Sequence, residues 1–198
     1  MKGKLYVIDG IDGCGKSTIA ELVGKCLGTN ITVIEPFSNR ELIDELDFVA
    51  STMNKSKEEI FSEKLINIAW LMDLFINTKR HIVALLEEGK NVFLVRYVLS
   101  AKVYSLATTK ADISELFEIY NLLPVPDLGF FISIDSSIAE SRIIRRNEQR
   151  TYYENKEYLD RIHEKYTEFL SREIYPIVEL NGEKSQLELL NCILSYIK

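Results

Sequence analysis

The segment Gly10–Ser17 reads Gly-Ile-Asp-Gly-Cys-Gly-Lys-Ser and matches the phosphate-loop pattern G-x-x-x-x-G-K-[ST] at every position. An apolar run, Leu5–Asp9, precedes it and predicts a buried strand, and Ser17–Leu27 follows it with helical spacing of apolar residues. In this order, glycines let backbone N–H groups turn toward an anion, and the helix N-terminus favours the same anion. The loop therefore predicts a fold built around a nucleoside triphosphate.

The polar residues of the loop have distinct predicted tasks. Lys16 neutralises the β- and γ-phosphates, and the Ser17 hydroxyl suits Mg²⁺. Cys14 occupies a variable position, where a packing role is favoured over a reactive thiol. The predicted ATP-binding residues are Gly10, Asp12, Gly13, Cys14, Gly15, Lys16, Ser17, Thr18 and Arg142. A GTPase, an ATPase motor and a small-molecule kinase all fit the loop, although an Asn-Lys-x-Asp guanine signature is missing.

Apolar strands alternate with helical segments along the whole chain. The predicted strands are Leu5–Asp9, Ile31–Ile34, Asn91–Val95, Leu128–Ile134 and Pro176–Leu180. The predicted helices are Ser17–Leu27, Arg40–Thr52, Lys57–Glu88, Ser100–Leu106, Asp112–Leu122 (with Asp112 as N-cap), Ser136–Asn147, Asn155–Ile174 and Lys184–Ile197. This alternation predicts an α/β fold of the P-loop nucleoside triphosphate hydrolase type, with a five-stranded parallel sheet flanked by helices on both faces. A single domain spanning residues 1–198 is expected.

Charge and cysteine content narrow the class of partner. The net charge is −6, which disfavours nucleic acid but leaves room for a locally basic site that binds small anions. Three cysteines without CxxC spacing indicate reduced thiols, and no apolar run has the length of a membrane helix. We expect a cytoplasmic protein that binds small-molecule nucleotides and contacts neither nucleic acid nor membrane.

Four arginines cluster near the C-terminal third of the chain, at positions 142, 145, 146 and 150. Arginines on a closing lid stabilise the charge that develops on a transferring phosphoryl group, and the lid excludes water. The alternative is a solvated charge run at a helix C-terminus. The phosphate loop favours the lid, predicted at about residues 142–154, with Arg146 and Arg150 as catalytic residues.

Arg96 and Tyr97 follow the third predicted strand at its carboxyl end, which is where open α/β sheets bind ligands. Arg96 is a candidate clamp for the phosphate of an acceptor. Trp70, Tyr97 and Tyr104 are candidates for stacking on a base.

The ordered set of these motifs resembles the thymidylate kinase family of nucleoside monophosphate kinases. The matching segments are Ile8–Thr18, Arg96-Tyr97-Val98-Leu99-Ser100, Pro126-Asp127-Leu128, Tyr153-Glu154, Tyr158-Leu159, Arg161-Ile162 and Tyr166. The resemblance implies transfer of the ATP γ-phosphate to a deoxynucleoside monophosphate, with dTMP as the leading acceptor, and a homodimer. It also implies that Arg96 holds the acceptor phosphate, Tyr104 lies by the sugar, Asp12 lies near acceptor and metal, and Tyr153 lies near the base.

Three positions depart from the family pattern. Val95 stands where an Asp precedes Arg-Tyr, Trp70 replaces a stacking Phe, and Leu74 replaces an Arg that binds thymine. Glu35, before Pro36, is hypothesised to take over the role vacated at Val95, toward Mg²⁺ or the acceptor. Two alternatives stay open: a deoxynucleoside kinase, and a nucleotide-binding paralogue with little catalysis.

Overall fold

A five-stranded sheet forms the centre of the computed structural model, which describes residues 2–146 and 154–197. The strands are β1 (Leu5–Asp9), β2 (Ile31–Ile34), β3 (Asn91–Val95), β4 (Leu128–Ser133) and β5 (Ile177–Asn181). They lie in the order β2-β3-β1-β4-β5, and every neighbouring pair is parallel. The predicted five-stranded parallel sheet is confirmed.

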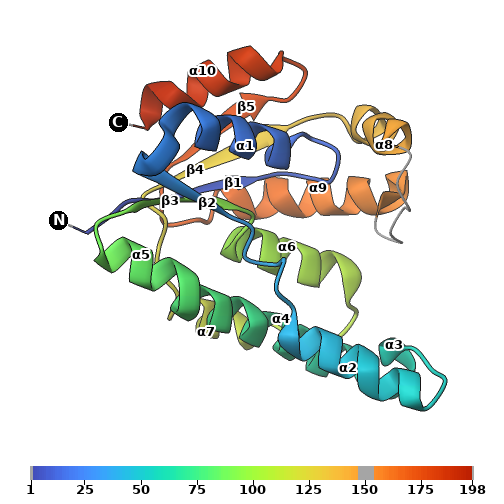
Figure 1. Ribbon diagram of the computed structural model, residues 1–198. Helices are drawn as coiled ribbons and strands as arrows, with labels where there is room; N and C mark the ends of the chain where they lie inside the picture. The colour runs from blue at the N-terminus through green and yellow to red at the C-terminus, as the bar shows by residue number, and fades with distance from the viewer. Residues whose placement is uncertain (1, 147–153, 198) are drawn as a thin grey trace.

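Helices cover both faces of this sheet, because parallel strands must be joined by crossovers. The helical elements are α1 (Lys16–Leu27), η1 (Gly28–Asn30), α2 (Glu41–Thr52), α3 (Lys57–Ile60), α4 (Glu63–Asn77), η2 (Thr78–Val83), α5 (Ala84–Glu87), α6 (Val98–Thr108), α7 (Leu116–Tyr120), α8 (Ser136–Arg145), α9 (Lys156–Leu170) and α10 (Gln186–Tyr196). Figure 1 shows α1 and α10 on one face, and α4 to α7 with α9 on the other.

Alternate side chains of β1 belong to different buried clusters. Tyr6 and Ile8 belong to the buried cluster that contains residues of α1 and α10, and Leu5 and Val7 belong to a second cluster with Leu74 of α4. A strand buried on both faces must be apolar throughout, which explains the uninterrupted run that predicted β1.

The predicted long helix over Lys57–Glu88 is wrong as a single element. Ser56 caps α3 in a capping box with Glu59, the chain becomes extended at Phe61, and Ser62 then caps α4 by accepting from the Leu65 N–H at 3.3 Å. Serine favours helix starts because its hydroxyl satisfies an otherwise unpaired N–H, so each one begins a new helix. Beyond α4, the helical backbone continues without a break through the π-helical stretch η2 into α5.

The predicted N-cap at Asp112 is also wrong. Its carboxylate accepts from the N–H and the hydroxyl of Ser114, which makes a local turn, and α7 begins only at Leu116. Aspartate stabilises such turns as readily as helix starts. The remaining predicted elements differ from the observed ones only at their ends; for example, α9 ends at Leu170 rather than at Ile174.

The carboxyl ends of β1 and β3 meet at the same edge of the sheet, because the two strands are parallel neighbours. The phosphate loop follows β1 and Arg96 follows β3, so the topology brings the two motifs together at the position where ligands bind in open α/β sheets. Across residues 2–146 and 154–197, no helix combines the length and apolar character needed to span a bilayer.

Candidate functional site

The phosphate loop turns sharply between β1 and α1. Gly10, Gly13 and Gly15 all have positive φ values, of 147°, 80° and 102°. Gly13 also lies against α8: a Cβ at this position would be 2.4 Å from the carbonyl oxygen of Ala139. The loop therefore needs glycine at residue 13 for two reasons, backbone conformation and lack of space.

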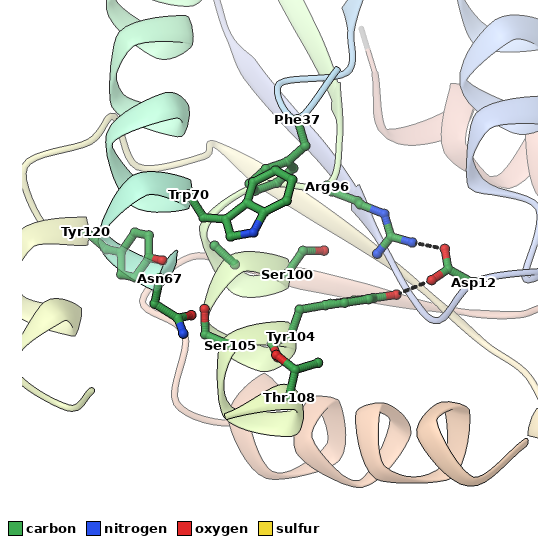
Figure 2. Close-up of a pocket in the computed structure, with 11 residues that line it drawn as sticks. Asp12, Phe37, Asn67, Trp70, Arg96, Ser100, Tyr104, Ser105, Thr108 and Tyr120 are labelled. Carbon is green, nitrogen blue, oxygen red and sulfur yellow. Dashed lines mark hydrogen bonds and ion pairs between the residues drawn. The ribbon is translucent and has the colours of Figure 1, made fainter. Parts of the chain in front are cut away.

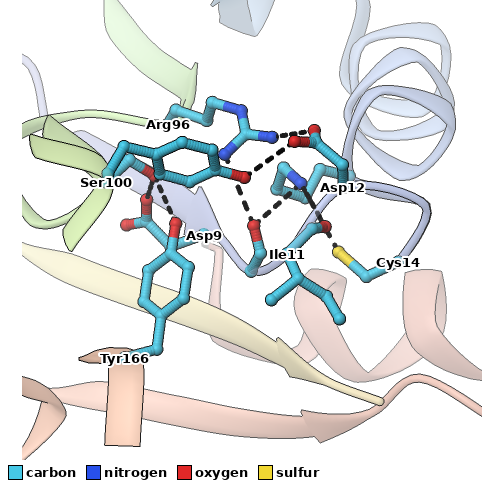
Figure 3. A network of polar contacts seen from close by, with 10 residues as sticks. Asp9, Ile11, Asp12, Cys14, Arg96, Ser100 and Tyr166 are labelled. Atoms are coloured by element: carbon cyan, nitrogen blue, oxygen red, sulfur yellow. Dashed lines mark hydrogen bonds and ion pairs between the residues drawn. The ribbon is translucent and has the colours of Figure 1, made fainter. Parts of the chain in front are cut away.

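The Lys16 ammonium group is buried within the loop. Its Nζ donates to the carbonyl oxygens of Gly10 at 2.9 Å and Ile11 at 2.8 Å, and it lies 3.6 Å from Cys14 Sγ (Figure 3). Burial and the nearby Arg96 guanidinium lower the pKa of Lys16. Cys14 is only 1% exposed and belongs to the core, which fits the packing role.

A polar cavity of about 390 Å³ lies over the loop. Its wall includes these predicted residues: Asp12, Gly13, Gly15, Lys16, Ser17, Thr18, Glu35, Arg96 and Arg146. Glu35 therefore shares a cavity with the Ser17 hydroxyl, and Val95 lines the same cavity. We call this cavity the phosphate end of the site.

Arg96, Asp12 and Tyr104 form a linked group beside this cavity. Arg96 pairs with the Asp12 carboxylate, and its guanidinium lies 4.6 Å from the centre of the Tyr104 ring. The Tyr104 hydroxyl donates to the other Asp12 oxygen at 2.9 Å (Figure 2). Burial alone would raise the pKa of Asp12, but Arg96 and Lys16 bring it below its ordinary value. The structure thus presents an ionised carboxylate and a fixed guanidinium side by side.

Arg96 owes its orientation to an unusual backbone. Its φ is 69°, in the left-handed region that non-glycine residues rarely adopt, between the end of β3 and the start of α6. Strained residues of this kind concentrate at functional sites. The guanidinium points toward the phosphate loop, and its Nη1 lies 3.5 Å from the Gly10 carbonyl oxygen.

A second cavity of about 320 Å³ adjoins the first. It lies between α4 and α6, and its wall comprises Asp12, Phe37, Asn67, Trp70, Arg96, Ser100, Ala101, Tyr104, Ser105, Thr108 and Tyr120 (Figure 2). The Trp70 ring meets Phe37 edge-on with 6.2 Å between ring centres. We call the part away from Arg96 the base end, because its aromatic wall suits a flat heterocycle.

Sequence reasoning found Trp70, Tyr104, Arg96 and Asp12 of this wall and missed the others. A usable signal was present in α6, where Ser100, Tyr104 and Thr108 follow one another at four-residue spacing and so share a helix face. Asn67 carried a similar signal, because it lies three residues before Trp70 on the same predicted helix. For Phe37 and Tyr120, which come from distant parts of the chain, the sequence offered no such signal.

Tyr97 does not lie in either cavity, so its predicted place at the acceptor is wrong. Its side chain is 1% exposed and packs in the second core cluster with Leu94 and Leu74. The turn at Arg96 directs consecutive side chains to opposite sides, so Arg96 faces the site and Tyr97 faces the core. Leu74, the replacement for a base-binding Arg, is likewise fully buried in that cluster.

The predicted lid is described only in part. Arg142 donates to the carbonyl oxygen of Gly182 at 3.0 Å, beside the connection from β5 to α10, and Arg146 lines the phosphate end. Arg150 and Tyr153 lie outside the described residues. The structure therefore brings Arg146, but not Arg142, to the cavity that contains Lys16.

A buried polar chain below the loop was not predicted. Ser100 donates to the Asp9 carboxylate, and the Ser100 and Tyr166 hydroxyls are 2.6 Å apart (Figure 3). Burial raises the pKa of Asp9 to about 6, although Ser100, Arg96 and Lys16 counteract this. The chain connects β1, α6 and α9, the elements that hold the loop and Arg96 in place.

Comparison with known proteins agrees with this geometry. The family model described as thymidylate kinase matches residues 8–193. A probable thymidylate kinase of Pyrobaculum aerophilum is 31% identical over 184 residues, covering 91% of this chain and 90% of that protein. The thymidylate kinase of Leptospira interrogans is 31% identical over 202 residues, covering 96% and 93%.

A solved thymidylate kinase from Candida albicans has the same fold, with a TM-score of 0.74 at 21% identity, covering 99% of this chain and 91% of that one. The family model spans the loop, both cavities and most of the sheet. This chain therefore belongs to the thymidylate kinase family of ATP-dependent nucleoside monophosphate kinases, which phosphorylate dTMP to dTDP.

Proposed function

We propose that this protein transfers the γ-phosphoryl group of ATP to the 5′-phosphate of dTMP by means of the residues described above. The observation that carries the proposal is the junction of the two cavities. Asp12, Phe37 and Arg96 line both the phosphate end and the aromatic pocket. A guanidinium at that junction suits an acceptor that already carries a phosphate.

On the donor side, the loop residues hold the triphosphate. Backbone N–H groups from Gly10 to Thr18 surround the phosphates, and Lys16 exchanges its carbonyl partners for β- and γ-phosphate oxygens. Arg146 adds positive charge where the γ-phosphate lies. Arg142, which donates to the Gly182 carbonyl oxygen outside that cavity, is proposed to contact the nucleoside of ATP. Arg150 is proposed to join Arg146 from the predicted lid.

On the acceptor side, Arg96 holds the phosphate of dTMP while Tyr104 and Asp12 face its sugar. An oxygen of that phosphate forms a bond to the γ-phosphorus as the bond to the bridging oxygen breaks, and ADP leaves with the released electron pair. Lys16, Arg96 and Arg146 stabilise the charge on the transferring group. Trp70 lies against the base, and Tyr153 is proposed to approach it from the lid.

Ser17 and Glu35 are the residues proposed to hold Mg²⁺. One hydroxyl and one carboxylate in the same cavity fit this ion, which is usually bound by one or two protein oxygens together with substrate phosphates. Within the described ranges, no group of three or more His, Cys, Asp or Glu residues forms a larger metal site. When bound, Mg²⁺ would neutralise phosphate charge.

The variant Glu35→Gln tests this assignment, and it should lower kcat at least about tenfold, or ~1.4 kcal/mol. The control is Glu21→Gln, on the exposed surface of α1, which should leave kcat unchanged.

Assays of ADP release with different acceptors test the reaction. We expect turnover with dTMP and none with thymidine, because a neutral hydroxyl gives Arg96 no anion to hold. Turnover with thymidine alone would identify a deoxynucleoside kinase. ATP binding without turnover on any nucleoside or monophosphate would leave a nucleotide-binding protein.

We also propose that two copies associate through α2 and α4. These packed helices expose large apolar side chains: Leu42, Phe48 and Val49 on α2, Met53 directly after it, and Leu65 and Met72 on α4. Apolar groups gathered in this way favour burial against a second protein surface. Sedimentation should give a dimer of the 22.8 kDa chain, and Val49→Glu should give a monomer.

A cytoplasmic location is also proposed, because the described cysteines Cys14, Cys26 and Cys192 are free thiols, which are typical of reducing compartments.

A further inference from the structure

We propose that Asn67 specifies the acceptor base by accepting a hydrogen bond from its ring N–H through the carboxamide oxygen. The bases with such a group in the pyrimidine series are thymine and uracil. This inference rests on the proposed function, because it assumes that the second cavity receives the acceptor nucleotide. It assigns base selection to a residue on α4 that no motif identified.

Asn67 lies on the wall of the acceptor cavity, one helical turn before Trp70. Residues three apart share a helix face, so the amide and the indole project toward the same space. Figure 2 shows Asn67 beside Tyr120 and Ser105, at the end of the cavity away from Arg96 and Asp12. A nucleotide with its phosphate on Arg96 would place its base at this end.

The orientation of the Asn67 amide is fixed by its own helix. Nδ2 donates to the Glu63 carbonyl oxygen at 2.9 Å, while Oδ1 receives no hydrogen bond from the residues that the structure describes. The side chain as a whole is only 8% exposed. Oδ1 keeps exposed surface in the cavity. A ligand that covers this oxygen must supply a donor, because an acceptor left buried without one is costly.

Two hydroxyl groups of the same wall already donate to protein acceptors. Thr108 Oγ1 donates to the Tyr104 carbonyl oxygen at 2.7 Å. Ser100 donates to Asp9. Asn67 Oδ1 differs from these hydroxyls because an amide oxygen can only accept, so a ligand that covers it has to supply a donor.

The N-terminal turn of α4 is also held against the end of α6. The Glu63 carboxylate accepts from Thr109 Oγ1 at 2.6 Å and from the N–H groups of Lys110 at 2.8 Å and Ala111 at 3.0 Å. Four bonds therefore meet at Glu63, one of them from Asn67. The amide oxygen is presented from a rigid support, which is what selective recognition requires.

The fixed orientation explains the expected preference. Thymine and uracil carry a hydrogen at N3, whereas cytosine has a lone pair there that would face Oδ1. Turning the amide to suit cytosine would break the Nδ2 bond to Glu63 and set two carbonyl oxygens against each other. We therefore expect dTMP and dUMP to be preferred over dCMP.

Asn67→Leu, which has nearly the same shape without the polar atoms, tests this assignment. We expect kcat/KM for dTMP to fall about 10- to 100-fold, the range for an unpaired buried polar group, and the preference for dTMP over dCMP to fall with it. Thr108→Val is the matched control, since it lines the same cavity with a hydroxyl that is already bonded. Its dTMP/dCMP ratio should stay within about threefold of wild type.

The fluorescence of Trp70 gives a binding readout that needs no catalysis, because it is the single tryptophan of the chain and lines this cavity. The wild type should bind dTMP at least tenfold more tightly than N3-methyl-dTMP, and this comparison needs no variant to fold. Equal binding of the two, or an unchanged dTMP/dCMP ratio in Asn67→Leu, would overturn the role of Asn67 while leaving the kinase reaction intact. A different result would contradict the proposed function: dTMP would bind to the wild type but would not be phosphorylated.

Discussion

The two ends of the site are built differently. The phosphate end comes mainly from one continuous loop, joined by Arg96, Glu35 and Arg146. Two of its cations already have protein partners: Lys16 donates to loop carbonyl oxygens, and Arg96 pairs with Asp12. The base end comes mainly from α4 and α6, and its wall is mainly aromatic and apolar, with the Asn67 amide oxygen as an unpaired acceptor. Charged groups at the phosphate end stabilise the transition state and should therefore control kcat. Contacts with the base are the same before and during the reaction, because the base takes no part in it, so they should control KM.

Arg96→Met should give the largest effect and break the phosphate end most directly. It removes the cation at the junction of the two cavities and leaves the half-buried Asp12 carboxylate with the Tyr104 hydroxyl but without its ion-pair partner. We expect kcat to fall about 10³-fold, or ~4 kcal/mol of transition-state stabilisation. Steady-state kinetics with dTMP and ATP measure it. Arg80→Met, which removes an exposed arginine paired with Glu41, is the control and should leave kcat unchanged.

Gly13→Ala should disrupt the phosphate end through space rather than charge. The new Cβ would lie 2.4 Å from the Ala139 carbonyl oxygen on a backbone with φ of 80°. We expect a loss of ~3 kcal/mol in the free energy of unfolding, combining left-handed strain with a backbone clash. Gly15→Ala has a similar φ of 102° but nothing within 4 Å of its Cβ, so it should cost only ~1 kcal/mol. Equal losses in urea unfolding would show that contact with α8 is unimportant.

The same contrast explains what could be predicted from sequence. The loop, the strands and Arg96 were predictable because each is marked by a local pattern whose physical cause lies within a few residues. The base end was only half predictable, because Asn67 and Phe37 meet through the packing of α4 against the rest of the fold. Tyr97 was misplaced for a related reason: neighbours in a motif can face opposite sides, and only the backbone at Arg96 decides which.

Asp9→Asn tests the buried polar chain of Asp9, Ser100 and Tyr166 below the phosphate loop. In the unfolded chain the Asp9 pKa is near 3.8, and in the folded protein it is about 6, so the folded state binds more protons between these values. Raising the pH through this window therefore lowers stability, by about 2–3 kcal/mol for a shift of this size. Asparagine has no carboxyl group to ionise, so the stability of the variant should not fall over this pH range, and its amide oxygen can still accept the hydrogen bond from Ser100. Urea unfolding should show similar stability near pH 4 and a more stable variant at pH 7.5; a constant difference would contradict the assignment.

Trp70→Phe should give the smallest effect and sharpen the distinction between the two ends. Phe keeps an aromatic face for the base and the edge contact with Phe37, but it loses part of the indole surface. We expect KM for dTMP to rise about two- to fivefold, less than ~1 kcal/mol, with kcat unchanged. Trp70→Ala removes the stacking surface and should raise KM further, again without lowering kcat. If either variant lowered kcat as strongly as Arg96→Met, the base end would be positioning the phosphate, and the division of labour between the two ends would be wrong.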